Sequence, residues 1–128
     1  MLNVVSIFNA NNLTILPVAF HFNSGRVGKF IECEFEVPLP ICRSKIVSEE
    51  RASVTFVIQA SKHRRSWQTM VAFRQSTGVS EVVWKTRKAY KFWRYVLVDH
   101  SGKEAWFSGI GWFIKTKDFL KLSIQTEQ

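Results

Sequence analysis

The chain has 128 residues, of which 46% are hydrophobic and 22% are charged. This composition excludes a disordered chain and fits one globular domain with a sizeable core. The apolar stretches are shorter than the roughly 20 residues of a membrane-spanning helix, so we expect no membrane span. The two cysteines, Cys33 and Cys42, are too few for a disulfide framework. We therefore expect Cys33 to be a buried free thiol and the chain to be made in a reducing compartment.

The net charge of +8 is distributed unevenly along the chain. Residues 1–60 hold five basic and five acidic residues, whereas residues 61–128 hold thirteen basic and five acidic residues. The whole excess therefore lies in the second half. A positive field of this kind favours nucleic acid, an anionic glycan or the acidic surface of a partner protein; the alternative is a basic face that serves only solubility.

In chain order, short stretches with alternating apolar and polar side chains predict a series of β-strands. The first ten residues are expected to form a terminal strand or an arm. The later strands are expected at 29–37, 53–60, 67–74, 80–86, 92–99, 104–115 and 119–125.

Polar turns separate some of these strands, and the clearest are 61–66 and 100–103. No segment shows the apolar stripe and the caps of a long helix, although short helical turns at 9–12 or 117–119 remain open. Many short strands with frequent turns are typical of a β-sandwich or a β-barrel.

The first strand after the N-terminal segment alternates most clearly. Its three glutamates, Glu32, Glu34 and Glu36, share one side, so we expect that side to face water and the other side to face the core. Two prolines follow, Pro38 and Pro40. They are expected to end the strand, because proline cannot donate a hydrogen bond to a sheet.

The stretch 92–99 has apolar side chains on both of its faces, which predicts a central strand that is covered from both sides. Gly109 and Gly111 interrupt the next strand. Glycines at such positions indicate a bulge or a close approach of another group to the backbone.

The sequence shows no arrangement of residues that is typical of catalysis. The period-2 spacing of the acidic set in 32–36 is typical of a solvated strand face rather than a pair of catalytic carboxylates. The histidines, His21, His63 and His100, are scattered, and no His, Cys or Asp cluster has the spacing of metal ligands. We therefore expect no enzyme activity, no cofactor and no metal.

Basic residues interleaved with aromatic residues form the candidate ligand or partner surface. Such a surface suits nucleic acid, where cations follow phosphates and rings stack on bases, and it equally suits a glycan. The alternative for each tryptophan is a place in the core, which we favour for Trp93 and Trp106. The candidate surface comprises Lys62, His63, Arg64, Arg65, Trp67, Trp84, Lys85, Arg87 and Lys88.

Several motifs between residues 28 and 115 resemble those of discoidin domains, also called coagulation-factor type C domains. The order and spacing of the motifs carry the resemblance, and no ligand residue is carried over from the family. The motifs are Lys29-Phe30-Ile31-Glu32-Cys33-Glu34-Phe35, Val57-Ile58-Gln59-Ala60-Ser61, Ser66-Trp67-Gln68-Thr69-Met70, Ala89-Tyr90-Lys91-Phe92-Trp93-Arg94-Tyr95-Val96 and Ile110-Gly111-Trp112-Phe113.

The resemblance implies an all-β fold, a single β-sandwich of the galactose-binding-like, jelly-roll type. It also implies a binding module, since members occur in secreted lectins, in glycosidases and in bacteriophage tails. Residues 1–27 are then an N-terminal arm and first strand, 28–115 the sandwich, and 116–128 a C-terminal strand or tail.

Three functions remain open for such a module. The first is a non-catalytic structural component of a phage particle (tail, neck or baseplate), located in the virion, oligomeric there, and binding other proteins of the assembly or glycan. The second is a free lectin-like binder of anionic glycans. The third is a basic β-barrel that binds single-stranded nucleic acid.

Overall fold

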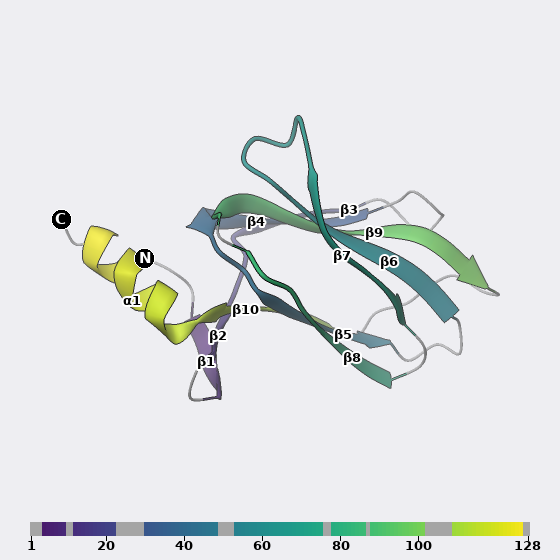
Figure 1. The fold of residues 1–128 in the computed structure, drawn as a ribbon, viewed down its shortest axis with the longest axis horizontal. Helices are drawn as coiled ribbons and strands as arrows, with labels where there is room; N and C mark the ends of the chain where they lie inside the picture. Colours follow the sequence, from purple (N-terminus) through teal and green to yellow (C-terminus); the bar gives the residue numbers. More distant parts are fainter. Residues whose placement is uncertain are drawn as a thin grey trace.

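The computed structural model describes residues 4–9, 12–22, 30–48, 53–75, 78–86, 88–101 and 109–126. The strands in these residues form two antiparallel five-stranded sheets that lie one above the other, and a helix follows the last strand (Figure 1). The described part is therefore a β-sandwich, as expected, and not the barrel considered for nucleic-acid binding.

Each sheet mixes strands from distant parts of the chain. The first sheet has the order β1 (Val4–Asn9), β2 (Asn12–Ile15), β10 (Gly109–Lys115), β5 (Arg43–Ser48) and β8 (Gly78–Val83). The second sheet has the order β3 (Ala19–Phe22), β4 (Phe30–Leu39), β9 (Tyr90–Ser101), β6 (Ser53–Ser61) and β7 (Gln68–Gln75).

An aromatic core joins the two sheets. Trp93 of β9 and Trp112 of β10 are fully buried, and their ring centroids lie 6.2 Å apart. Tyr95 lies 5.2 Å from Trp112 and 5.6 Å from Phe56 by the same measure. These rings come from both sheets, so their packing fixes how one sheet sits on the other.

One chain of buried hydrogen bonds also crosses the core. The Tyr95 hydroxyl group donates to Ser44 Oγ at 2.5 Å, and Ser44 Oγ donates to the carbonyl oxygen of Gly111 at 2.7 Å. This chain links β9 of the second sheet to β5 and β10 of the first.

The predicted alternation of core-facing and outward-facing side chains is confirmed in the central strands. Val54, Phe56, Ile58 and Ala60 of β6 are all buried on one face. The strand β9 is central, since it pairs with β4 on one side and with β6 on the other. Trp93 is in the core as expected, whereas Trp106 lies outside the described residues.

Two expectations for β4 were wrong. The strand continues through Pro38 to Leu39, because the pairing of β4 with β9 is irregular between Glu34 and Leu39, so the missing proline N–H group breaks no regular ladder there. In addition, Glu32 is only 2% exposed, although it lies on the side that was expected to face water.

The closing strand expected at 119–125 is also wrong, because this segment is the helix α1 (Thr116–Thr126). Asp118 lies in its first turn, where a negative charge is favourable, and Phe119 packs against the core. Residues 104–108 of the expected preceding strand, and 102–103 of the expected turn, lie outside the described residues.

The close approach expected near the two glycines of β10 is present at Gly111. A Cβ atom at this position would lie 3.2 Å from Cζ of Phe113, whereas a Cβ atom at Gly109 would meet nothing within 4 Å. Gly111 therefore makes room for the Phe113 ring. Both cysteines are buried free thiols, and no described helix is long and apolar enough to cross a membrane.

Candidate functional site

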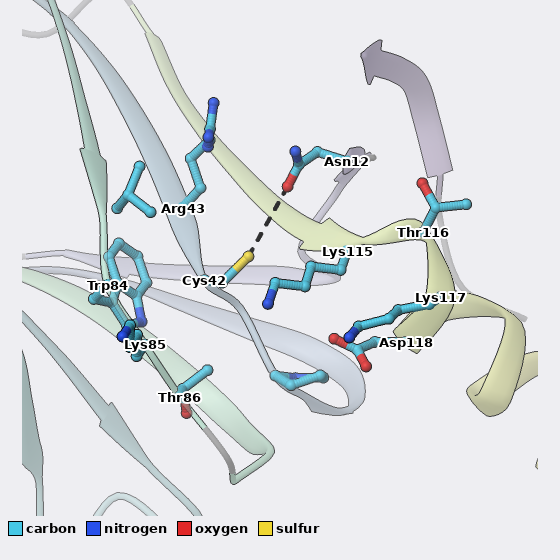
Figure 2. A pocket seen from close by; sticks show the side chains of 12 residues that line it. Asn12, Cys42, Arg43, Trp84, Lys85, Thr86, Lys115, Thr116, Lys117 and Asp118 are labelled. Atoms are coloured by element: carbon cyan, nitrogen blue, oxygen red, sulfur yellow. Dashed lines mark hydrogen bonds between the residues drawn. The ribbon is translucent and has the colours of Figure 1, made fainter. Parts of the chain in front are cut away.

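The strand directions gather several connections at one end of the sandwich. At this end β4 connects to β5, and β10 connects to α1. The strand β8 ends here and the strand β2 begins here. Residues from these four places line a pocket of about 670 Å³ (Figure 2). Trp84 and Lys85 lie on one side of the pocket, and Lys117 and Asp118 lie on the other.

The pocket is strongly basic. Its lining includes Arg43, Lys85, Lys115 and Lys117, against the single carboxylate of Asp118. The Arg43 guanidinium lies 3.6 Å from a carboxylate oxygen of Glu81, so its charge is partly neutralised.

The three pocket lysines are exposed, and no acidic group lies within ion-pair distance of them among the described residues. The first turn of α1, residues 116–118, also lines the pocket. The free N–H groups at a helix start add partial positive charge there. The pocket therefore favours a negatively charged ligand.

Trp84 forms a rigid apolar wall of this pocket. It is 8% exposed, its ring centroid lies 5.7 Å from that of Trp93, and its backbone N–H group donates to the carbonyl oxygen of Cys42 at 3.0 Å. Its Nε1–H group has no hydrogen-bond acceptor within the described ranges. Such an unsatisfied donor in a pocket wall is typical of a place where a ligand or water completes the hydrogen bonding.

Cys42 lies in the pocket wall between Asn12 and Lys115 (Figure 2). Its thiol is 4.0 Å from Asn12 Oδ1 and 3.8 Å from the carbonyl oxygen of Phe113. Burial raises the pKa of this thiol above 9.0, and the nearby Lys115 and Arg43 only partly offset the effect. A thiol that stays protonated is a poor nucleophile, so Cys42 acts here as a packing residue.

The basic turn at 62–66 joins β6 to β7 near the same end of the sandwich (Figure 1). We call it the hairpin loop. Ser61 Oγ accepts hydrogen bonds from the backbone N–H groups of His63 at 3.3 Å and Arg64 at 2.8 Å. His63 Nδ1 accepts from the backbone N–H of Arg65 at 3.0 Å. These bonds hold the loop in shape while the side chains of Lys62 and Arg65 are exposed.

Arg64 differs from its neighbours in the hairpin loop. Its backbone has a φ of 68°, in the left-handed region that non-glycine residues seldom adopt. Its Nε atom lies 2.8 Å from Oε2 of the buried Glu32, and its guanidinium lies 5.8 Å from the centre of the Phe92 ring. The charge of Arg64 is therefore used to neutralise a buried carboxylate.

Trp67 also contacts another side chain of the protein, that of Arg94. The Arg94 guanidinium lies 3.8 Å from the centre of the Trp67 ring and 5.3 Å from that of Phe30. The same guanidinium donates to Gln59 Oε1 at 2.9 and 2.7 Å. Burial lowers the pKa of Arg94, and the field of Glu32 opposes this effect. Trp67 and Arg94 thus stabilise the outer face of the second sheet.

The structure divides the predicted candidate surface into three groups. Trp84 and Lys85 line the pocket, Lys62, His63 and Arg65 are exposed on the hairpin loop, and Arg64 and Trp67 turn toward the outer face of the second sheet. Lys88 is exposed on the connection from β8 to β9. Arg87 lies outside the described residues.

The sequence reading missed Arg43, Lys115 and Lys117. Lys115 and Lys117 follow the apolar end of β10, and this abrupt change to charged residues was the available signal. The sequence predicts a strand that ends at Lys115 and leaves a short helical turn open at 117–119, and neither expectation places these lysines beside Trp84. No group of three or more His, Cys, Asp or Glu that could hold a metal ion occurs in the ranges that the structure describes.

No family model matches the chain, and no curated protein matches it. Several solved structures do. The CBM32 of AlyQ in complex with 4,5-unsaturated mannuronic acid matches with a TM-score of 0.60 and 10% identity, over 88% of this chain and 97% of that one. Chitosan-binding module 1 from a chitosanase/glucanase of Paenibacillus sp. IK-5 matches with a TM-score of 0.58 and 16% identity, over 74% and 76%.

A longer protein, truncated AlyQ with CBM32 and alginate lyase domains, matches with a TM-score of 0.69 and 9% identity. The match covers 81% of this chain but only 34% of that one. The chain therefore has the fold of the galactose-binding-like, discoidin-type carbohydrate-binding modules. The resemblance inferred from the sequence motifs is confirmed at the level of the fold.

Proposed function

We propose that this chain is a non-catalytic module that binds an anionic glycan in the pocket beside Trp84. The observation that carries the proposal is the composition of the pocket. Three exposed lysines and the start of a helix surround the Trp84 wall, and within the described ranges these lysines have no acidic partner. The lysines are Lys85, Lys115 and Lys117.

The chemistry of this pocket fits a sugar acid. The carboxylate of a uronic acid accepts hydrogen bonds from lysine ammonium groups, and these charge-assisted bonds are stronger than neutral ones. Sugar rings carry apolar C–H groups that pack against aromatic side chains, and the edge of the Trp84 ring is available for such packing. A similar fold binds such a ligand elsewhere, since the CBM32 of AlyQ is described in complex with 4,5-unsaturated mannuronic acid.

The absence of catalysis is part of this proposal. The thiol of Cys42 is held protonated, and the single pocket carboxylate, Asp118, has no second carboxylate beside it among the pocket residues. Glycoside hydrolysis commonly requires two carboxyl groups across the scissile bond. The pocket supports binding rather than bond cleavage.

The test compares two sugars of equal length. Isothermal titration of the purified chain with a mannuronic acid octasaccharide and with a neutral mannose octasaccharide separates charge from sugar shape. We expect saturable binding of the acidic sugar, weaker at about 200 mM than at about 50 mM salt, because salt screens exposed charges. Equal binding of the neutral sugar, or no binding of either, would overturn the proposal.

A structural role in a phage tail, neck or baseplate stays a prediction. This prediction is based on the discoidin domains that the sequence motifs resemble, because such domains occur in bacteriophage tails. The check is sedimentation of the native material followed by mass spectrometry, in which a component of a particle would travel with it in a fixed ratio.

A further inference from the structure

We propose that the glycan is an extended polyanion, bound by an internal segment that runs from the pocket past Lys88 to the hairpin loop. This inference rests on the proposed function and adds to it the form of the ligand. A single sugar acid or a chain end would use the pocket alone, whereas a polymer would use both places.

Some cations near the hairpin loop are held by the fold itself, and others are left free. Arg64 pairs with Glu32, Lys91 lies 3.7 Å from a carboxylate oxygen of Glu34, and Arg94 bonds to Gln59. Carboxylates neutralise Arg64 and Lys91, and Arg94 is held by the Gln59 amide and the Trp67 ring, so all three cations stabilise the outer face of the second sheet.

A second set of cations has no acidic partner within 4 Å in the part of the chain that the structure describes. Besides Lys45 of β5, Arg94 of β9 and Lys121 of α1, this set has six exposed members, and these six lie at the end of the sandwich that holds the pocket and the hairpin loop. They are Lys62, Arg65, Lys85, Lys88, Lys115 and Lys117. Unpaired charges of one sign, gathered at one end of a molecule, attract and orient an oppositely charged partner.

The spacing between the pocket and the hairpin loop also favours an extended ligand. Leu39, next to the pocket residue Pro40, pairs with Tyr90 at the start of β9, and Ser61, at the base of the hairpin loop, pairs with Phe92. Thus β4 and β6 flank β9, and neighbouring strands lie about 4.8 Å apart. The rim of the pocket and the base of the loop are therefore about 10 Å apart.

This spacing exceeds the width of a sugar ring and is comparable to the Debye length of about 8 Å at physiological salt. The electrostatic attraction between a small anion in the pocket and the charges of Lys62 and Arg65 would therefore be weak. A polymer that spans the pocket and the hairpin loop would bind with higher affinity than a small anion. Once it is bound at one of them, its contact with the other forms at a high effective concentration.

The aromatic rings near this path favour a glycan over single-stranded nucleic acid. Nucleic-acid binding of this kind uses aromatic rings whose faces are open to bases. In the described residues near the pocket and the hairpin loop, Trp84 is packed against Trp93, and Arg94 lies over one face of the Trp67 ring. The free groups along the path are cations, which suits a ligand recognised by regularly spaced negative charge.

The experiment is a length series of mannuronic acid oligosaccharides with two, four and eight residues, titrated into the full chain. We expect the affinity to rise by more than tenfold from the disaccharide to the octasaccharide. The variant Lys62→Gln/Arg65→Gln should lose about fivefold to tenfold in affinity for the octasaccharide, since each exposed charge contact contributes about twofold to fivefold. Its affinity for the disaccharide should be unchanged.

Lys45→Gln is the control for the loss of one charge away from the path, because Lys45 lies within β5 of the first sheet and does not line the pocket. It should bind the octasaccharide like the unmodified chain. Thermal unfolding checks that each variant is folded.

The outcomes separate this inference from the proposed function. Equal affinities for the disaccharide and the octasaccharide, or an unchanged octasaccharide affinity in the hairpin-loop variant, would overturn the extended path while the pocket function stands. No binding of any length would overturn both. Tighter binding of a single-stranded oligonucleotide of equal charge would overturn the glycan assignment.

Discussion

Arg64 Nε lies 2.8 Å from Glu32 Oε2, and this ion pair joins the hairpin loop to the outer face of the second sheet. The Glu32 side chain is 2% exposed, whereas that of Arg64 is 45% exposed. A buried carboxylate is unfavourable unless a cation compensates it. The pair explains why one arginine of the basic loop turns inward while its neighbours remain exposed.

Arg64→Gln should destabilise the protein, because it leaves the Glu32 carboxylate buried without its cation. We expect the free energy of unfolding to fall by about 1–3 kcal/mol in urea denaturation. The adjacent Arg65→Gln should change it by less than about 0.5 kcal/mol, because the Arg65 side chain is exposed. Equal effects of the two variants would show that the ion pair does not stabilise the fold.

Ser44→Ala should cost more stability than Tyr95→Phe. The serine variant leaves two buried groups without their partner, the Tyr95 hydroxyl and the Gly111 carbonyl, and should cost about 1–3 kcal/mol. The tyrosine variant leaves Ser44 bonded to Gly111 and should cost about 0.5–1.5 kcal/mol. Urea denaturation of both variants measures the order, and a reversed order would contradict the hydrogen-bond chain described here.

Gly111→Ala should destabilise the first sheet, whereas Gly109→Ala should not. The added Cβ at Gly111 would press on the buried Phe113 ring, which we expect to cost about 1–3 kcal/mol. The Cβ at Gly109 would meet nothing within 4 Å, so this variant is the matched control. Thermal unfolding of the two proteins is the measurement, and equal melting temperatures would be the contrary result.

Stability should fall at alkaline pH. Burial raises the pKa of the Cys33 thiol from 9.0 to about 12 and raises the pKa of Tyr95 above 10.0. The unfolded chain releases these protons at lower pH than the folded chain does. Their stabilising contribution is therefore complete below pH 9 and declines as the pH rises from 9 toward 12.

The decline should reach about 1 kcal/mol per pH unit for each group once its unfolded form is deprotonated. Urea denaturation at intervals between about pH 8 and pH 11 measures it. Tyr95→Phe should reduce the slope above pH 10 and leave unchanged the slope between pH 9 and 10, where the thiols of Cys33 and Cys42 contribute. A flat profile up to pH 11 would contradict the assigned burial effects.

The strands that bury one face could be predicted from the sequence, because burial alone sets their alternation. The run from Val54 to Ala60 is the clearest case. Glu32 is buried although its side of the strand was expected to face water, because Arg64, which is distant in sequence, compensates its charge. The sequence left only a short helical turn open at 117–119, whereas α1 runs from Thr116 to Thr126, because contacts such as that of Phe119 with the core depend on the tertiary structure.

The site was only partly predictable for a related reason. Lys85 and Trp84 are adjacent in sequence and were recognised, but Lys115 and Lys117 reach the same pocket only through the pairing of β10 with β2 and β5. Free cations and paired cations cannot be distinguished from the order of residues alone. Arg64 and Arg65 are neighbours with opposite roles, and only the folded contacts distinguish them.

The most direct test of the account is the titration of a mannuronic acid octasaccharide into Lys85→Gln/Lys117→Gln, with Lys45→Gln as the control for lost charge. The double variant should lose about tenfold or more in affinity and keep its melting temperature, because both side chains are exposed in the pocket lining. Lys45→Gln should bind normally. An unchanged affinity in the double variant, or an equal loss in the control, would contradict binding at this pocket.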